Sequence, residues 1–318
     1  MTDYTVTTET LGLRATAAVF QLLCNNGLCY HRPAFLGPFN KWPFLFIYIE
    51  IFTFYLVLAM HPMVNIALRA ARDASEALIQ TSARLDRISV VNDDPLNFIS
   101  SADQDSEATL IYHLQKAYPN HSFQSRVSET IIGDAGEPTW LIDPLVGSFD
   151  FSRGSQNYGI TIACQIGGII THAILVIPGL SEEFVSTRGT GAQLNNQRIR
   201  VVDDGKFEDP LIAIEVDSDS PKQLGRIVTA MKTGGALVRM TGNSAIDMAY
   251  TAAGRISGGW CFNRSSLSHL ALSLILTEAG ALIGNETGSP QINNATELIF
   301  ASPRTFKALV KLRQSLKL

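Results

Sequence analysis

The residues best suited to chemistry in this sequence lie in the segment WLIDPLVGSFDF (140–151). Asp143 offers a carboxylate, the hard oxygen ligand that Mg²⁺ prefers. Gly147 and Ser148 are predicted to begin a helix, and the free backbone N–H groups and dipole of a helix start favour a bound phosphate. An Asp directly before Pro144 is equally typical of a residue that caps a turn. Asp143 and this helix start therefore stay open between a structural role and a role in binding.

Histidine and cysteine residues indicate no further site. Ser268 and His269 are adjacent, and neighbouring side chains on a helix point about 100° apart, which argues against a nucleophile with its base. The other histidines show no metal-ligand spacing, and we interpret Cys261 as a small buried hydrophobic residue. No CxxC pair occurs, which argues against a zinc site or a disulfide framework and fits a reducing compartment. The cysteines are Cys24, Cys29, Cys164 and Cys261.

Composition limits the classes of protein that fit. The chain has 318 residues, with 25 Lys and Arg against 29 Asp and Glu, a formal net charge of −4 and 46% hydrophobic residues. This length predicts one large domain or two small ones, and the hydrophobic content excludes wholesale disorder. An acidic balance predicts no direct nucleic-acid footprint, which would need clustered Lys and Arg.

Residues 1–59 differ from the rest, because they hold 12 of the 27 aromatic residues. Within them, Phe44–Met60 is almost entirely apolar, although Glu50 lies in its middle. One interpretation is a single membrane anchor, for which about 20 apolar residues are needed. The other is an upstream stretch before a true start at Met60. We favour the second, and with it a cytoplasmic protein, because the composition changes at a methionine and a patterned helix follows at once.

Residues 60–318 are predicted to form one mixed α/β domain. A first helix is indicated by apolar residues at helical spacing, and a second is expected to begin at Asp103 as N-cap and to end before Pro119. The apolar face of the first helix comprises Val64, Ala67, Leu68, Ala71, Leu78 and Ile79.

The β-rich runs come next in the chain. Strands are predicted at WLID (140–143), YGITIACQI (158–166), IITHAILVI (169–177), EEFVST (182–187) and LIAIEV (211–216). Gly167-Gly168 is a hairpin signal between two of them. Helices are expected near residues 221–232, 244–253, 266–279 and 303–317, separated by Gly234-Gly235, Gly258-Gly259 and GALIG (280–284). This order indicates a layered α/β or α+β sandwich.

The segment 140–151 resembles the WIDPIDGTTNF signature of the inositol monophosphatase family, which are magnesium-dependent sugar-phosphate phosphatases. MHPMVNIALRAARDASEALI (60–79) is similar to the start of the bacterial SuhB branch of that family. The resemblance continues through AYPNHSF (117–123), STRGTGAQLNNQRIRV (186–201), TGNSAIDMAYTAAGRISG (241–258) and LTEAGALI (276–283). It implies a layered αβαβα sandwich and a homodimer.

The same resemblance places the magnesium ligands. The family holds two or three Mg²⁺ ions with the Glu of a GEE-type loop, two Asp of DPIDG and the Asp of a WD motif. The corresponding positions here are Arg126, Asp143, Val146 and Ser268, so that only Asp143 keeps a carboxylate. Arg126 also adds a positive charge, and two unit charges 4 Å apart repel by about 4 kcal/mol at an effective dielectric of 20. We therefore expect weak magnesium binding or none.

Other family positions are partly kept. Asp103 and Ser148 correspond to the Asp and Thr that orient the nucleophilic water in the family, so they are the residual catalytic candidates. Asn97 and Cys261 stand where the family has an Asp and a substrate-contacting Glu. A structural interpretation is also open for the kept Asp103, which is typical of a helix cap, and for the replacing Arg126, which is typical of a solvated loop residue.

These residues support three hypotheses. The first is a non-catalytic family member that acts by binding, as the SuhB branch does when it contacts RNA polymerase and Nus factors in ribosomal-RNA transcription. The second is a working magnesium phosphatase with rearranged ligands such as Glu129, Asp134 or Asp150. The third is metal-free binding of phosphate or inositol phosphate, with Arg126 holding the anion against Gly147 and Ser148.

Overall fold

The computed structural model describes residues 61–316 except 95–96, 203–208, 216–220, 263–265 and 294. The chain divides into two units, Met1–Ala59 and Met60–Leu318, and the fold below is that of the second. The apolar segment Phe44–Met60, and with it the choice between anchor and upstream stretch, lies outside the described residues. Among the helices of the described ranges, none combines the length and the apolar character needed to cross a bilayer.

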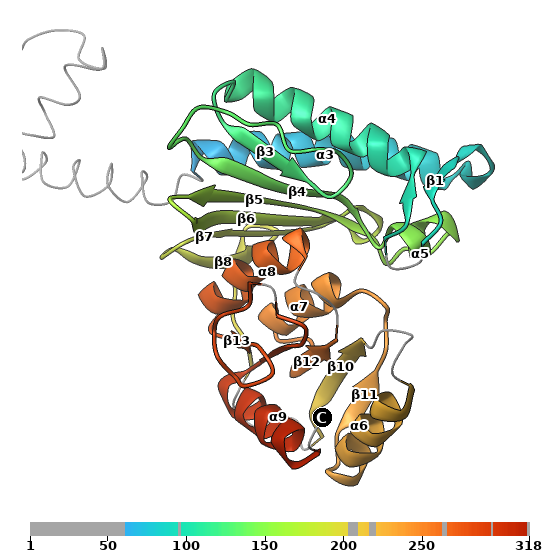
Figure 1. Cartoon of the computed structure of the whole chain (residues 1–318), viewed down its shortest axis with the longest axis vertical. Helices are drawn as coiled ribbons and strands as arrows, with labels where there is room; N and C mark the ends of the chain where they lie inside the picture. Colours follow the sequence, from blue (N-terminus) through green and yellow to red (C-terminus); the bar gives the residue numbers. More distant parts are fainter. Residues whose placement is uncertain are drawn as a thin grey trace, which may run out of the picture. The chain divides into compact units, whose positions relative to one another are not determined.

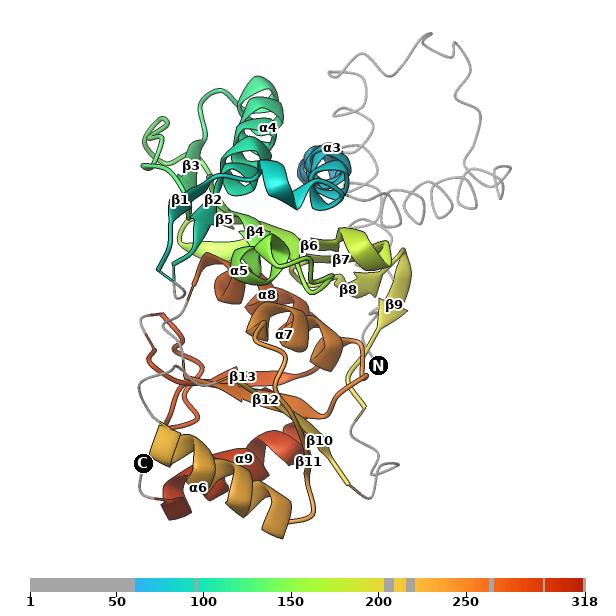
Figure 2. The same cartoon turned by 90° about the vertical axis from the view of Figure 1, so that its right-hand side faces the viewer.

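Five layers make up this unit, which confirms the predicted αβαβα sandwich (Figures 1 and 2). Helices α3 and α4 cover one face of a seven-stranded sheet, and α7 and α8 pack between that sheet and a five-stranded sheet. Helices α6 and α9 cover the outer face of the five-stranded sheet. The helix bounds are α3 Pro62–Ser82, α4 Ser101–Ala117, α5 Ser148–Ser152, α6 Pro221–Thr233, α7 Ser244–Ala252, α8 Leu267–Glu278 and α9 Pro303–Leu316.

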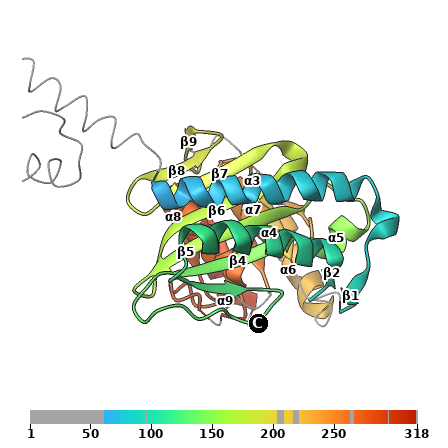
Figure 3. The same cartoon turned by 90° about the horizontal axis from the view of Figure 1, so that it is seen from above.

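Helices α3 and α4 lie side by side over the seven-stranded sheet (Figure 3). In α3, Pro62 occupies the first turn and the predicted apolar face is buried, except for Ile79, which is 48% exposed and does not belong to it. In α4, the predicted N-cap is wrong by three residues. Ser100 is the N-cap, and Asp103 is the third helical residue of a capping box, in which its carboxylate accepts from the backbone N–H of Ser100.

The seven-stranded sheet has the order β3-β4-β5-β6-β7-β8-β9, and all its pairs are antiparallel except β3 with β4. The Gly167-Gly168 hairpin is confirmed: both glycines have positive φ and they join β5 to β6. The bounds are β3 Ser122–Ser125, β4 Thr139–Val146, β5 Gly159–Ile166, β6 Ile169–Ile177, β7 Glu182–Thr187, β8 Gly191–Leu194 and β9 Gln197–Ile199. Before this sheet, β1 (Val90–Asn92) pairs with β2 (Ile99–Ser100).

The five-stranded sheet has the order β11-β10-β12-β14-β13, in which β10 is parallel to both of its neighbours. Gly258 and Gly259 lie between helices α7 and α8, as predicted, and they form the first half of strand β12. A Cβ on Gly258 would meet Phe300 O at 2.6 Å, and one on Gly259 would meet the Phe300 ring at 2.3 Å, so this strand needs glycine to pack against β14. The bounds are β10 Leu211–Glu215, β11 Leu237–Arg239, β12 Gly258–Cys261, β13 Leu282–Gly284 and β14 Leu298–Ala301.

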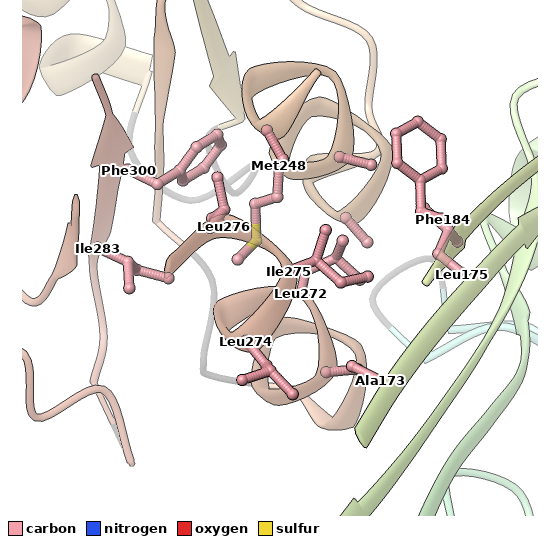
Figure 4. Close-up of a cluster of buried hydrophobic side chains, with 14 of the residues drawn as sticks. Ala173, Leu175, Phe184, Met248, Leu272, Leu274, Ile275, Leu276, Ile283 and Phe300 are labelled. Atoms are coloured by element: carbon pink, nitrogen blue, oxygen red, sulfur yellow. The ribbon is translucent and has the colours of Figure 1, made fainter. Parts of the chain in front are cut away.

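The middle helix layer provides the largest core. Figure 4 shows Leu272, Ile275 and Met248 between side chains from both sheets, with Ala173, Leu175 and Phe184 on one side and Ile283 and Phe300 on the other. Helix α8 is apolar nearly all around because it is enclosed by both sheets. This enclosure holds the start of α8 against the end of β4, where the candidate site lies.

Candidate functional site

The candidate site forms where β4 ends and where α4, α5 and α8 begin. Asp143 lies near the end of β4 and is buried, and the pairing of β4 with β5 is irregular between Asp143 and Val146. Ser148 is the first residue of α5, whose N-cap Gly147 has a φ of 80°. Ser268 lies in the first turn of α8. The fold thus brings together residues that are far apart in the sequence.

Arg126 lies at the centre of this site. Its Nε donates to Asp143 Oδ1 at 2.8 Å, and its Nη2 donates to Asp103 Oδ1. Two backbone carbonyls complete its contacts: Nη1 donates to Phe98 O at 3.1 Å and Nη2 to Leu145 O at 3.1 Å. The Arg126 side chain is only 20% exposed. Its interpretation as a solvated loop residue is therefore wrong, because it is part of a buried ion-pair network.

The carboxylate of Asp103 is saturated with donors. Besides Arg126, its Oδ2 accepts from Ser100 N at 2.8 Å, from Ser100 Oγ at 2.8 Å and from Ser148 Oγ at 2.6 Å. The structure therefore places Asp103 and Ser148, the residual catalytic candidates, in direct contact. The Ser148 hydroxyl proton is directed to Asp103, so its oxygen keeps only acceptor capacity.

The second oxygen of Asp143 is also occupied. Ser268 Oγ donates to Asp143 Oδ2 at 3.0 Å, and it lies 2.9 Å from Ser266 Oγ. Arg126 and Ser268 stand at two of the predicted ligand positions, and both donate to the one carboxylate that remains. Val146, at another ligand position, is a buried apolar residue. The residues present do not fit a magnesium ion, since a guanidinium, a hydroxyl and an alkyl group take the places of its carboxylate ligands.

The charge of Arg126 is held firmly by its surroundings. Burial alone would lower the pKa of its guanidinium, but Asp143 and Asp103 together outweigh burial and raise that pKa above the usual value of arginine. Arg126 is consequently charged at every accessible pH. Its single positive charge lies between two buried carboxylates. Without Arg126, these carboxylates would need a bound cation as their partner.

A second polar group next to this site consists of His269, Ser244 and Glu215, and the sequence analysis did not predict their contacts. His269 Nδ1 accepts from Ser266 N at 3.1 Å, so its Nε2 carries the proton in the neutral ring and donates to Ser244 Oγ at 2.7 Å. Ser244 N in turn donates to Glu215 Oε2 at 2.9 Å. Burial raises the pKa of Glu215, and the charges of Asp247 and Asp150 raise it further. The one sequence signal for this group is the three-residue spacing of Ser266 and His269, which is that of a capping box at a helix start.

The alternative ligands do not gather at the site. Glu129 and Asp134 are exposed on the loop that follows β3. Asp150 lies in α5, where burial raises the pKa of its carboxyl group. Among the described residues, no group of three or more Asp, Glu, His or Cys side chains could hold a metal ion. Cys261 is buried, as predicted.

The structure brings the predicted phosphate-binding residues Arg126 and Ser148 to the same carboxylate, that of Asp103, and little of the donor capacity of Arg126 is left. Four of the five N–H bonds that a guanidinium has already donate within the protein at Arg126. The space beside Gly147 is filled, since a Cβ there would meet Asn157 O at 2.6 Å and Asn243 Nδ2 at 2.7 Å. This packing does not favour a phosphate held between Arg126 and the start of α5.

The five-layered sandwich, with a polar site where β4 meets α5 and α8, is the fold that the family resemblance of the sequence implies. The model of the inositol monophosphatase family matches residues 59–318. The chain belongs to this family.

Relatives and solved structures agree with this assignment. The chain is 34% identical over 261 residues to the Nus factor SuhB of Pseudomonas aeruginosa, which covers 79% of this chain and 95% of that protein. It is 30% identical over 254 residues to the Nus factor SuhB of Escherichia coli K12, with 79% and 95% covered. The suhB structure from Bartonella henselae matches with a TM-score of 0.75 at 27% identity, covering 78% of this chain and 97% of that one. The Thermotoga maritima IMPase matches in fold, with a TM-score of 0.70 at 21% identity, covering 79% and 96%.

Proposed function

We propose that this protein is a non-catalytic member of the inositol monophosphatase family that acts by binding. One observation carries the proposal: the Arg126 guanidinium bridges the buried carboxylates of Asp143 and Asp103. A guanidinium in this position supplies the positive charge that Mg²⁺ supplies in the family. Unlike a metal ion, it cannot activate a water molecule as a nucleophile.

The replaced ligand positions support the same conclusion. A magnesium ion beside Asp143 would have to displace Arg126 and Ser268 from both carboxylate oxygens, and the alkyl side chain of Val146 would offer it no oxygen ligand. Each displaced donor would leave a buried group without a partner, which costs about 1–3 kcal/mol for a neutral group and more for a charged one. The alternative of a working phosphatase with rearranged ligands has no comparable support, because Glu129 and Asp134 are exposed.

The direct test is the release of phosphate from inositol 1-phosphate by the full chain in millimolar Mg²⁺. We expect no release above that of an Asp143→Asn variant, with the Thermotoga maritima IMPase as the active reference. Magnesium-dependent release by the wild-type chain that Asp143→Asn abolishes would overturn the proposal.

The relatives indicate the kind of partner. Proteins at 34% and 30% identity are Nus factors, so we propose that this chain also joins the transcription machinery, through contacts to RNA polymerase or to other Nus factors, and that it does so as a homodimer. Its binding to purified RNA polymerase, alone and with Nus factors, tests the partner, and analytical ultracentrifugation tests the dimer. A monomer that binds none of these proteins would contradict this part of the proposal and leave the loss of catalysis untouched.

A further inference from the structure

Helices α6 and α9 form the outermost layer of the sandwich and lie next to each other (Figures 1 and 2). Their apolar residues face the five-stranded sheet, where Ile227 and Met231 of α6 and Phe306 and Leu309 of α9 are buried. Arg226 of α6 donates through Nη2 to the carbonyl of Leu316, at the last turn of α9. The two helices therefore present one combined outer surface.

This surface is basic, although the chain as a whole is acidic. Seven of the 25 Lys and Arg residues of the chain lie on these two helices of 13 and 14 residues, and none of its 29 Asp and Glu residues does. We call this surface the basic layer. Its Lys and Arg residues are Lys222, Arg226 and Lys232 on α6 and Arg304, Lys307, Lys311 and Arg313 on α9.

Most of these side chains are turned to solvent. Among the described side chains of the basic layer, all are exposed except Arg313, which pairs with Glu297 at 3.0 Å. Arg304, Lys307 and Lys311 recur at intervals of three and four residues, so they follow one face of α9 over about 10 Å. No ion pair within the described residues neutralises Lys232, Lys307 or Lys311.

We propose that the basic layer binds the phosphate backbone of nucleic acid without regard to base sequence. Lys and Arg side chains on a helix surface contact phosphates, which position a nucleic acid without reading it. Of the described side chains on α6 and α9, no large apolar one is exposed, and their aromatic residue Phe306 is buried. The described part of the layer therefore offers positive charge without an exposed aromatic side chain on which a base could stack.

A protein partner fits this surface less well. The centres of protein interfaces are depleted of Lys and rely on aromatic or aliphatic residues that fill pockets. Nucleic-acid interfaces are polar and strongly positive. The prediction of no nucleic-acid footprint rested on the net charge of the whole chain, which does not show that α6 and α9 fold against each other.

Binding of this kind is weak and depends on salt. Non-specific complexes have dissociation constants of about 10⁻⁴–10⁻⁶ M at physiological salt, and each neutralised phosphate of a single strand contributes about −0.7 to the slope of log K against log salt concentration. This inference is independent of the metal site, because the basic layer shares no residue with the network around Arg126.

The test measures the anisotropy of a labelled single-stranded RNA of mixed sequence with the full chain, over a series of KCl concentrations. A variant that combines Lys232→Gln, Lys307→Gln and Lys311→Gln removes three charges without removing an ion pair among the described residues. We expect it to bind at least tenfold more weakly at low salt and to flatten the slope by about 2. A matched variant, with Arg69, Arg84 and Arg87 each changed to Gln, removes three exposed charges from α3 and the turn after it. It is expected to keep the wild-type slope.

Three outcomes would overturn the proposal. They are no binding of the RNA by the wild-type chain at low salt, equal losses in the two variants, and binding of polyglutamate or of anionic lipid vesicles in preference to RNA. A duplex DNA of the same length distinguishes a preference for single strands from general phosphate binding, and binding of either nucleic acid through the basic layer supports the proposal.

Discussion

Arg126 donates to Asp143 across 2.8 Å at the end of β4, and it does so from the position where the family resemblance places a metal-binding glutamate. The side chain that replaces the glutamate therefore contacts the one predicted ligand that remains. Its second carboxylate partner is Asp103. By the family resemblance, Asp103 corresponds to an Asp that orients the nucleophilic water. Arg126 thus supplies a positive charge to both buried carboxylates without an external ion.

Removing this cation should destabilise the protein strongly. Arg126→Met leaves the carboxylates of Asp143 and Asp103 buried without a positive partner, and breaking a buried ion pair in this way costs about 3–5 kcal/mol. Urea unfolding of the full chain, followed by circular dichroism, measures the loss.

Two comparisons make this prediction specific. Arg72 pairs with Glu183 at 2.6 Å with its side chain 54% exposed, so Arg72→Met should cost less than about 1 kcal/mol. Adding Asp143→Asn and Asp103→Asn to Arg126→Met should recover part of the lost stability, because the uncompensated charges disappear. Equal losses for Arg126→Met and Arg72→Met would contradict the central role of Arg126.

Restoring the family ligands should restore metal binding. A variant with Arg126→Glu, Val146→Asp and Ser268→Asp gathers four carboxylates around one point, which suits Mg²⁺. Without metal it should be less stable than the wild type, because the carboxylates repel one another. At a Mg²⁺ concentration ten times its dissociation constant, the ion should stabilise it by about 1.4 kcal/mol. Thermal unfolding with and without Mg²⁺ measures this, and an equal Mg²⁺ effect on the wild-type chain would refute the account of the site.

The sequence predicts much of this fold because its longer elements carry strong local patterns. The runs 169–177 and 182–187 are rich in β-branched residues and form β6 and β7 with the predicted bounds. The short strands are absent from the prediction, namely β1, β2, β3, β8, β9, β11, β12, β13 and β14. Each has only two to four residues, and each is defined by its partner strand rather than by its own pattern.

The sequence identified most residues of the network around Arg126, but not how they contact one another. The resemblance places Arg126, Asp143 and Ser268 at metal-ligand positions of the family. The orientation in which Arg126 bridges two carboxylates depends, however, on the backbone carbonyls of Phe98 and Leu145. Carbonyl directions follow from the path of the backbone after folding, which no residue type reveals. The contact of His269 with Ser244 arises in the same way, from the packing of α7 against α8.

A buried histidine should make the stability of the protein depend on pH. His172 stacks on His61 with ring centroids 4.2 Å apart, and its Nδ1 lies 3.0 Å from Thr187 Oγ1. Burial, and after it the charge of His61, lowers the pKa of His172 from 6.5 to about 4. Between these two values the unfolded chain binds a proton that the folded chain does not. This contribution to stability is therefore complete above pH 6.5 and is lost as the pH falls toward 4.

Urea unfolding across this pH window tests the sign. His172→Asn keeps a polar group near Thr187 and removes the titration, so its stability should fall less with decreasing pH than that of the wild type. Parallel pH profiles for the two proteins would show that another group is responsible.

Two glycines that the sequence does not distinguish should respond oppositely to the same substitution. Gly258→Ala places a methyl group 2.4 Å from Ala301 Cβ and 2.6 Å from Phe300 O in the paired strand β14, so β12 must move away from its neighbour. Overpacking of this kind costs about 1–3 kcal/mol. Gly225 lies inside α6, where a Cβ meets nothing within 4 Å, so Gly225→Ala should stabilise the protein by about 0.5–1 kcal/mol through helix propensity. Chemical unfolding of both variants gives the two signs, and destabilisation by Gly225→Ala would mean that the outer surface of α6 packs against another part of the protein.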